Sequence, residues 1–134
     1  MRAMFLLATL LLGLAGPARA AESAAAQEVI RAQEQAFARG DAAAAYSHAA
    51  PAIREVFQHA EIFMQMVRQA YPPVYRHQRF EFGEAKVSNG HVAQRVQIVD
   101  EQGEAWEALY TLEQQPDGSL KITGCSLLKA GQSA

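Results

Sequence analysis

The chain has 134 residues and a formal net charge of −2. This length is enough for one domain that buries about two thirds of its unfolded surface, and it leaves no room for a second domain. The lack of a basic excess argues against nucleic acids and anionic membranes as partners, because both require a positively charged surface. Cys125 is the single cysteine, so an internal disulfide is excluded.

The N-terminus has the three parts of a secretory signal sequence. Arg2 supplies a positive start, Met4–Gly16 is an almost unbroken apolar run, and Pro17–Ala20 ends in the small-x-small pattern that a signal peptidase recognises. As a helix, the apolar run would be about 20 Å long, which is too short for a hydrocarbon core of roughly 30 Å. The sequence therefore predicts a cleaved leader over residues 1–20 rather than a membrane-spanning anchor.

Cleavage after Ala20 would leave a single domain over residues 21–134, with an ordered core over about residues 24–129. Arg2 and Arg19 would leave with the leader, which takes the net charge of the mature chain to −4. No cysteine lies near the cut, so no lipid attachment is expected there. The predicted location is the periplasm or the extracellular space, with a soluble mature protein and no stable membrane anchor.

Cys125 would then lie in a compartment where thiols tend to oxidise. A small buried hydrophobe on a strand is the favoured interpretation, because free cysteine is among the most buried residue types. Intermolecular pairing and a reactive thiol remain the alternatives.

The N-terminal half of the chain has helical periodicity. Apolar or small residues recur at spacings of three and four over Ser23–Arg39, with Gln33 as a polar break in the stripe and the first serine as the expected N-cap. Gly40 is expected to end this helix, and Asp41 is expected to cap the next one. That second helix is short and alanine-rich over Ala42–Ala49.

Two further helices are predicted before the proline pair at residues 72 and 73. Pro51–Phe57 begins with a proline, which suits a first helical turn, and carries a short apolar face. A longer helix is expected over Ala60–Ala70, with Phe63 and Val67 on its apolar face. It should end before Pro72, because proline disfavours helical geometry in the residue that precedes it.

Beyond residue 73 the apolar period changes to two, which is typical of strands. Turn signals at Ser88–Gly90, Glu101–Gly103 and Pro116–Gly118 separate four segments and predict a four-stranded antiparallel meander. The four segments are centred on Phe80–Phe82, Val92–Val99, Trp106–Glu113 and Leu120–Cys125.

Helices followed by a meander predict an α+β domain with the N-terminal helices packed on one face of the sheet. In the last strand, alternation puts Ile122 and Gly124 on one face and Cys125 on the other. In the third strand, the more apolar side is expected to face the helices, and it consists of Trp106, Ala108, Tyr110 and Leu112.

The run Phe37–Tyr46 resembles the helix-Gly-Asp-helix opening of the NTF2-like and SnoaL-like superfamily. This resemblance implies an NTF2-like, cystatin-like cone, which is an α+β fold that encloses a pocket. Members of the superfamily commonly place a strand between the second and third helices, whereas Pro51–Phe57 has helical periodicity here. No position of this chain matches the catalytic motifs of the superfamily enzymes, so none of their catalytic residues is transferred.

Several segments spread over residues 25–128 carry a longer resemblance. They are Ala50–Ile53, Phe63, Met66–Val67, Ala70–Arg76, Gln94–Val96, Trp106–Tyr110, Gln115–Gly118 and Ile122–Cys125. Together they resemble the bacterial family called domain of unknown function 4864. The resemblance implies an exported bacterial protein and assigns no activity.

The candidate ligand-binding side chains are aromatic residues and one amide, because buried phenols need hydrogen-bond partners and can orient a ligand. They would line a pocket between the sheet and the helices, and ordinary core packing is the alternative. They are Tyr46, Tyr71, Tyr75, Gln94, Trp106 and Tyr110.

No metal site, no cofactor and no catalytic residue is predicted. The possible metal ligands lack the i, i+4 or clustered spacing that metal ions favour. No serine lies in a Gly-x-Ser-x-Gly elbow, and no glycine-rich phosphate loop follows a strand. The possible metal ligands are His48, His59, His77, His91, Glu55 and Glu61.

Three functions are compatible with these residues. The preferred one is non-enzymatic binding of a small apolar or amphipathic ligand in a sheet-helix cavity, since aromatic polar groups occur without a nucleophile-base pair. The second is a protein-interaction module, a homodimer that pairs through the outer sheet face around Val99 and Leu109. The third is a cofactor-free isomerase or cyclase, with a tyrosine as oxyanion donor and Asp41 or Glu84 as base.

Overall fold

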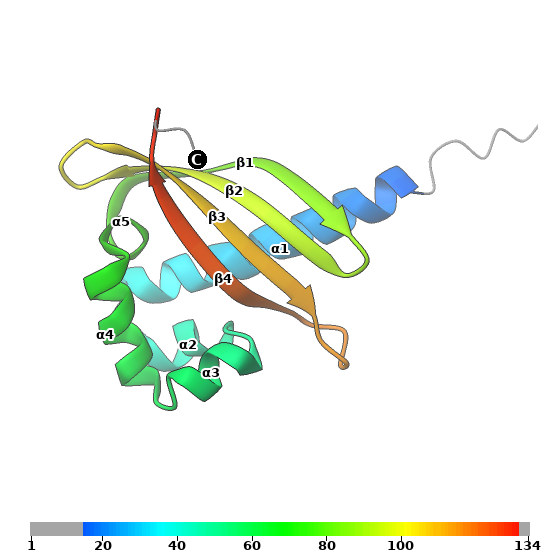
Figure 1. The fold of residues 1–134 in the computed structure, drawn as a ribbon, viewed down its shortest axis with the longest axis horizontal. Helices are drawn as coiled ribbons and strands as arrows, with labels where there is room; N and C mark the ends of the chain where they lie inside the picture. The colour runs from blue at the N-terminus through cyan, green and yellow to red at the C-terminus, as the bar shows by residue number, and fades with distance from the viewer. Residues whose placement is uncertain (1–14, 132–134) are drawn as a thin grey trace, which may run out of the picture.

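The computed structural model describes residues 15–131, which form helices followed by strands (Figure 1). The helices are α1 (Ala15–Ala38), α2 (Ala42–Ser47), α3 (Pro51–Val56), α4 (Ala60–Ala70) and α5 (Pro72–Tyr75). The strands are β1 (His77–Ser88), β2 (His91–Asp100), β3 (Ala105–Gln114) and β4 (Leu120–Lys129). Most of the predicted leader, residues 1–14, lies outside the described residues. No helix within residues 15–131 combines the length and the hydropathy needed to cross a membrane.

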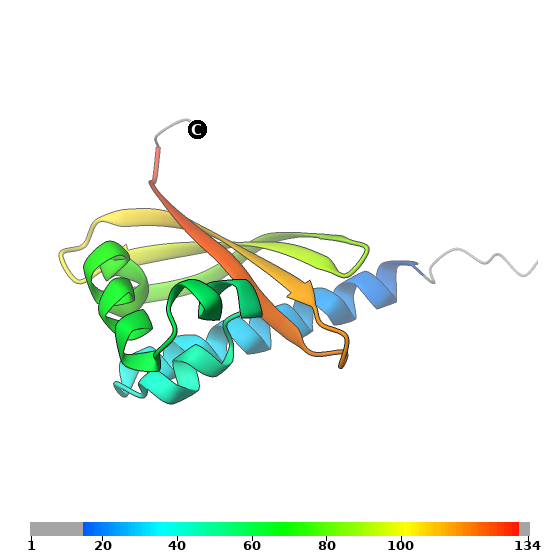
Figure 2. The same cartoon turned by 60° about the horizontal axis from the view of Figure 1, so that its bottom comes forward.

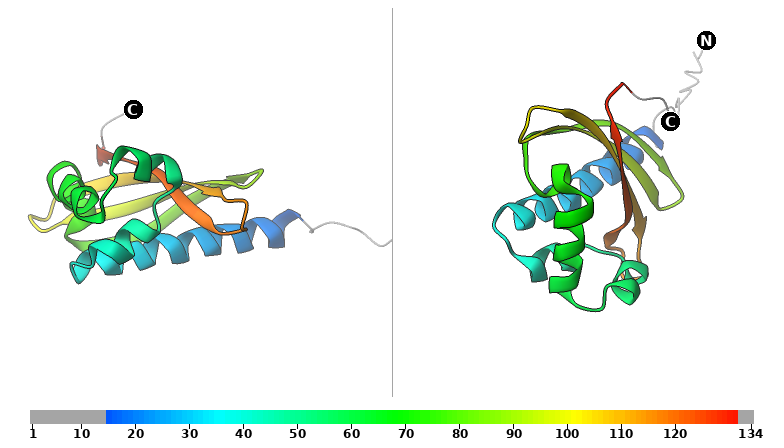
Figure 3. Two further views of the ribbon diagram at one scale, coloured as in Figure 1. Left: turned by 90° about the horizontal axis from the view of Figure 1, so that it is seen from below. Right: turned by 60° about the vertical axis from the view of Figure 1, so that its left-hand side comes forward.

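The four strands form one antiparallel sheet in the order β1-β2-β3-β4, which confirms the predicted meander and the α+β class. The described helices gather on one face of this sheet, and α1 runs lengthwise beneath it in Figure 2. α1 contacts β1, β2 and β4, and it also contacts α2 and α5. The opposite face of the sheet carries none of the described helices (Figure 3).

Several helix signals are confirmed. Gly40 has a φ of +69°, the left-handed conformation that ends α1. Asp41 caps α2, because its Oδ1 accepts a hydrogen bond from the backbone N–H of Ala44 at 3.0 Å. Pro51 occupies the first turn of α3, and α4 has the predicted bounds. The segment at Pro72–Tyr75 goes beyond the prediction, since it forms the extra helical turn α5.

The prediction that Ser23 caps the first helix is wrong. α1 already includes Ala15, so Ser23 lies well inside it. The stretch around this serine is rich in alanine, which has the highest helix propensity, and one serine does not interrupt it.

The predicted end of the second helix is also wrong, since α2 stops at Ser47 rather than at Ala49. The chain leaves the helix to pair with β4. Ala50 N donates to Ile122 O at 2.8 Å, and Ile122 N donates to His48 O at 2.8 Å. Backbone groups that an α-helix would have used internally are thereby bonded to the sheet.

The inner face of the sheet is the predicted one. Ala108, Tyr110 and Leu112 of β3 are buried, and Trp106 is partly buried against the same core. Phe37 of α1 and Phe63 of α4 pack into this core, with their ring centroids 6.3 Å apart. The core therefore lies between the sheet and the helices, which explains why apolar alternation in β3 identified the buried side.

A bulge in the pairing of β3 with β4 corrects the predicted faces of the last strand. Leu112 pairs with Ile122, but the next pair is Thr111 with Gly124, so β4 carries one residue more than β3 at this point. The extra residue reverses the alternation of β4. Cys125 consequently pairs with Tyr110 on the helix-covered side, and Gly124 does not continue the face of Ile122 as predicted.

Candidate functional site

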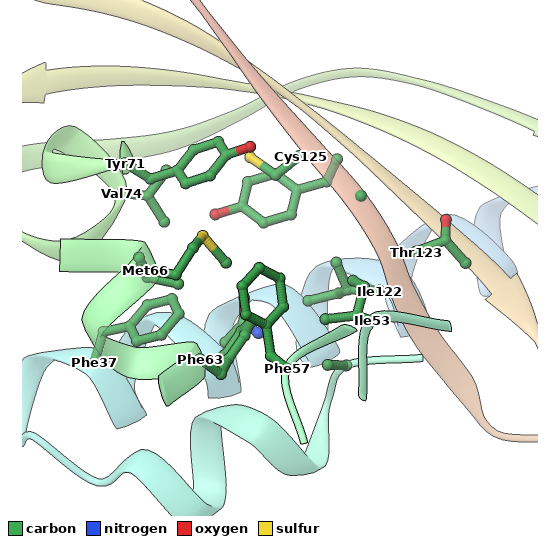
Figure 4. Close-up of a pocket in the computed structure, with 15 residues that line it drawn as sticks. Phe37, Ile53, Phe57, Phe63, Met66, Tyr71, Val74, Ile122, Thr123 and Cys125 are labelled. Carbon is green, nitrogen blue, oxygen red and sulfur yellow. The ribbon is translucent and has the colours of Figure 1, made fainter. Parts of the chain in front are cut away.

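A cavity of about 250 Å³ lies between the helices and β4, inside the covered face of the sheet. α1, α3, α4, α5 and β4 all contribute to its wall, together with one residue of β3. Figure 4 shows Tyr71, Met66 and Phe57 arranged around this space, with Cys125 on the β4 side. The lining residues are Gln33, Phe37, Ala49, Ile53, Phe57, Phe63, Met66, Val67, Tyr71, Val74, Tyr110, Ile122, Thr123, Gly124 and Cys125.

Aromatic rings form much of the wall near α4. The centroid of Phe63 lies 6.3 Å from that of Phe57 and 6.3 Å from that of Phe37. Tyr46 supports this group from outside, with its ring 5.7 Å from Phe63. Such tilted and edge-on contacts are the preferred geometry of aromatic pairs, so the wall is formed by packed rings rather than by loosely placed side chains.

The segment that contains α3 closes one side of the pocket through few contacts. Ile53 and Phe57 line the pocket, yet no residue of α3 itself is buried. Hydrogen bonds to backbone oxygens add to the packing of Ile53 and Phe57 against the core. Tyr46 Oη donates to Phe57 O at 2.7 Å, and the Arg54 guanidinium donates to Ser47 O at 2.9 Å. This wall is therefore positioned both by α2 and by the edge of the hydrophobic core.

Polar atoms reach the pocket at a few points. Gln33 and Tyr110 are 4% and 2% exposed, and Tyr71 and Cys125 are partly buried. Burial raises the pKa of Tyr110 well above its ordinary value, and the neighbouring Cys125 adds to this. Burial also raises the pKa of the Cys125 thiol to about 12. Both groups are therefore protonated and uncharged at neutral pH.

The pocket brings together two of the six predicted ligand-binding residues, Tyr71 and Tyr110. Tyr46 lies directly behind the wall, where its hydroxyl is bonded to the backbone of Phe57. Tyr75 packs against the other side of Phe37, at 6.0 Å between centroids. Neither Tyr46 nor Tyr75 lines the cavity.

The remaining two predicted residues lie at other points of the sheet. Gln94 is fully buried, and its amide donates to Gly83 O at 3.0 Å and to Arg95 O at 2.8 Å. Trp106 donates from Nε1 to Asp100 Oδ2 at 2.9 Å. These bonds use the polar atoms of both side chains within the fold, and neither residue borders the pocket.

Several lining residues were missed by sequence reasoning. Phe57 and Met66 carry no signal beyond ordinary apolar periodicity, and Cys125 turns inward only through the bulge. Gln33 had a signal, because it interrupts the apolar stripe of the first helix. A buried amide on a core-facing stripe needs a partner or a ligand, and the Gln33 Nε2 donates to Ala45 O at 3.2 Å.

The two carboxylates considered as catalytic bases lie away from the pocket. Asp41 is the cap of α2 and also contacts Arg39, and Glu84 lies on an exposed part of β1. Of the histidines, His77 contacts Glu34 across the α1–β1 junction, with Nε2 2.5 Å from Oε2. Residues 15–131 contain no group of three or more histidine, cysteine or acidic side chains placed to hold a metal ion.

Comparison with known protein families gives a match over most of the chain. A family model described as "Domain of unknown function (DUF4864)" matches residues 19–134, which is most of the chain. The matched range includes every residue that lines the pocket. A search of curated proteins found no match.

Proposed function

The chain belongs to the DUF4864 family, and we propose that it binds a small apolar or amphipathic ligand in the pocket between its helices and β4. The observation that carries this proposal is the pocket itself. Ordinary packing leaves few voids larger than a water molecule, whereas this pocket, which is open to solvent on one side, has a volume of about 250 Å³ and is lined mainly by apolar side chains.

The volume sets the size of the ligand. A cavity of about 150 Å³ lined by aliphatic and aromatic side chains binds benzene. Scaling by volume, a pocket of 250 Å³ takes a molecule of about ten non-hydrogen atoms. This size corresponds to a substituted ring or a short alkyl chain rather than to a lipid with two tails.

The same proposal includes the location and the wider relationship of the protein. The apolar run followed by Pro17–Ala20 supports a signal peptide over residues 1–20, with cleavage and export to the periplasm or beyond. The Gly40–Asp41 junction supports a relationship to the NTF2-like superfamily. An exported domain of this kind would meet its ligand outside the cytoplasm.

Native mass spectrometry tests the proposal on protein purified from a bacterial periplasm without detergent. We expect a fraction of the protein to carry an added mass that is lost on mild activation. Cys125→Leu, which places a larger side chain in the pocket, should abolish the added mass, whereas Leu109→Ala on the opposite sheet face should retain it. Absence of added mass, together with no binding of small aromatic probes, would contradict the proposal.

A homodimer through the outer sheet face is the second candidate function. That face carries none of the described helices, and Leu128 is 37% exposed among partly buried Leu109 and Val99. An Arg95–Glu107 ion pair lies beside them, so the patch mixes apolar and charged groups. Sedimentation at high micromolar concentration tests this candidate: a dimer that Leu109→Asp dissociates supports it, and a strictly monomeric mass refutes it.

A further inference from the structure

Among residues 15–131, none of those that line the pocket has a charged side chain. Its wall consists of apolar and aromatic groups, the amide of Gln33, two phenols and one thiol. Thr123 of β4 also lines the pocket, but its hydroxyl is engaged within the sheet, where it donates to Thr111 Oγ1 at 2.9 Å. The chemistry of this wall restricts the class of ligand further than the volume does.

An ionised ligand would lose free energy on entering such a site. Transfer of a charged group out of water costs several kcal/mol unless a counter-charge or several hydrogen bonds replace its hydration. Tyr110 and Cys125 cannot provide a negative charge at neutral pH, because burial raises the pKa of each. Gln33 carries no charge at any pH. The charge of Glu34 acts on Tyr110, but Glu34 does not line the pocket and is already paired with Arg31 and His77. Neither a carboxylate nor an ammonium group of a ligand would therefore find an unpaired counter-charge inside this pocket.

An uncharged hydrogen-bonding group has partners in the same wall. The Gln33 Nε2 is used by Ala45 O, which leaves the amide oxygen of Gln33 as an acceptor. Tyr110 has a hydroxyl that can donate. The thiol of Cys125, whose residue pairs with Tyr110 between β3 and β4, is a neighbour of this phenol, and a thiol is a weak hydrogen-bonding group. A ligand oxygen would be a better partner for this phenol than sulfur.

We infer that the pocket takes an uncharged ligand of about ten non-hydrogen atoms that carries a hydroxyl or carbonyl group, with Tyr110 as hydrogen-bond donor to its oxygen. This inference rests on the proposed function and adds the class of ligand to it. It separates neutral alcohols, phenols and ketones from the fatty acids and amines that an apolar pocket of the same volume would otherwise admit.

Three probes of similar size test the inference by titration of the purified protein, followed in two-dimensional amide NMR spectra at neutral pH. They are para-ethylphenol, para-ethyltoluene and para-methylbenzoate. We expect the phenol and the hydrocarbon to bind, and the benzoate anion to bind at least about a hundredfold more weakly than the hydrocarbon, because its charge has no partner.

The variant Tyr110→Phe removes the donor and keeps the ring. It should weaken binding of para-ethylphenol about three- to tenfold, the range for one neutral hydrogen bond, and leave binding of para-ethyltoluene within about twofold. Tyr75→Phe is the matched control. It removes a phenol hydroxyl that lies outside the pocket, near the Arg76 guanidinium, and should change neither affinity.

Two results would overturn the inference while the proposed function survives. One is a benzoate affinity within about tenfold of the hydrocarbon affinity, which needs no variant to be measured. The other is an equal loss of phenol and hydrocarbon binding in Tyr110→Phe, which would make this residue a packing element only. Failure of all three probes to bind would instead overturn the proposed function.

Discussion

Replacing Cys125 by leucine should stabilise the ligand-free protein. The bulge in β4 turns this residue toward the pocket, where its thiol lies among Tyr110, Ile122 and the α4 side chains. A larger apolar side chain at this position would extend into the pocket of about 250 Å³ instead of into packed neighbours. In a packed core the same change would instead force neighbours apart.

The expected magnitude follows from the groups added. The leucine side chain has two non-hydrogen atoms more than that of cysteine, and each additional buried carbon group contributes about 0.8 kcal/mol. Ordering the leucine side chain costs about 0.5–1 kcal/mol. The free energy of unfolding should therefore rise by about 1 kcal/mol, which corresponds to about 3–5 °C in Tm for a domain of this size.

Urea denaturation of refolded, ligand-free protein measures this difference. The matched control is Val96→Leu, because Val96 is fully buried in β2 and does not line the pocket. The added carbon there should cost about 1–3 kcal/mol through overpacking. A loss of stability in Cys125→Leu as large as that in Val96→Leu would refute the reasoning, since it would mean that the pocket is already filled by the protein itself.

Three further predictions concern single residues. Asp41→Ala should lower the free energy of unfolding by about 1 kcal/mol through loss of the α2 cap. Asp41→Asn keeps a side-chain oxygen as hydrogen-bond acceptor, so its free energy of unfolding, measured by urea denaturation, should stay close to that of the unmodified protein. Burial opposes ionisation of Glu34, but hydrogen bonds from His77 and Arg31 outweigh it and lower its pKa from 4.5. Stability measured by urea denaturation should therefore fall as the pH drops below about 4.5, and less steeply in Glu34→Gln; an unchanged slope would contradict this. Iodoacetamide should modify Cys125 about a thousandfold more slowly in the native protein than in the unfolded chain at mildly alkaline pH, because burial raises the pKa of the thiol from 9.0 to about 12. Mass spectrometry measures both rates, and equal rates would argue against the burial of Cys125.

The fold could be predicted largely because its signals are local. The bounds of α4 follow from apolar periodicity and from the proline at residue 72, and Gly40 and Asp41 mark a helix junction that needs no tertiary information. The early end of α2 is different in kind. It depends on hydrogen bonds between Ala50 and Ile122, which are distant in sequence, and no local pattern announces them.

The candidate site could be predicted only in part, for the same physical reason. Alternation in β3 identified Tyr110 as inward-facing, and a buried phenol is a natural candidate for ligand contact. The position of Cys125 depends on one extra residue in β4, which reverses every side chain that follows. Tyr75 and Trp106 have the same chemistry as the residues of the pocket, and only the three-dimensional structure separates them from it.

Binding of a small uncharged molecule in the pocket between the helices and β4 can be measured by titrating isotope-labelled protein with para-ethylphenol and following the amide signal of each residue. We predict saturable shifts concentrated at Val67, Ile122 and Cys125, which disappear in the Cys125→Leu variant. Shifts concentrated on the outer sheet face around Leu109, or no saturable shift at all, would contradict the account.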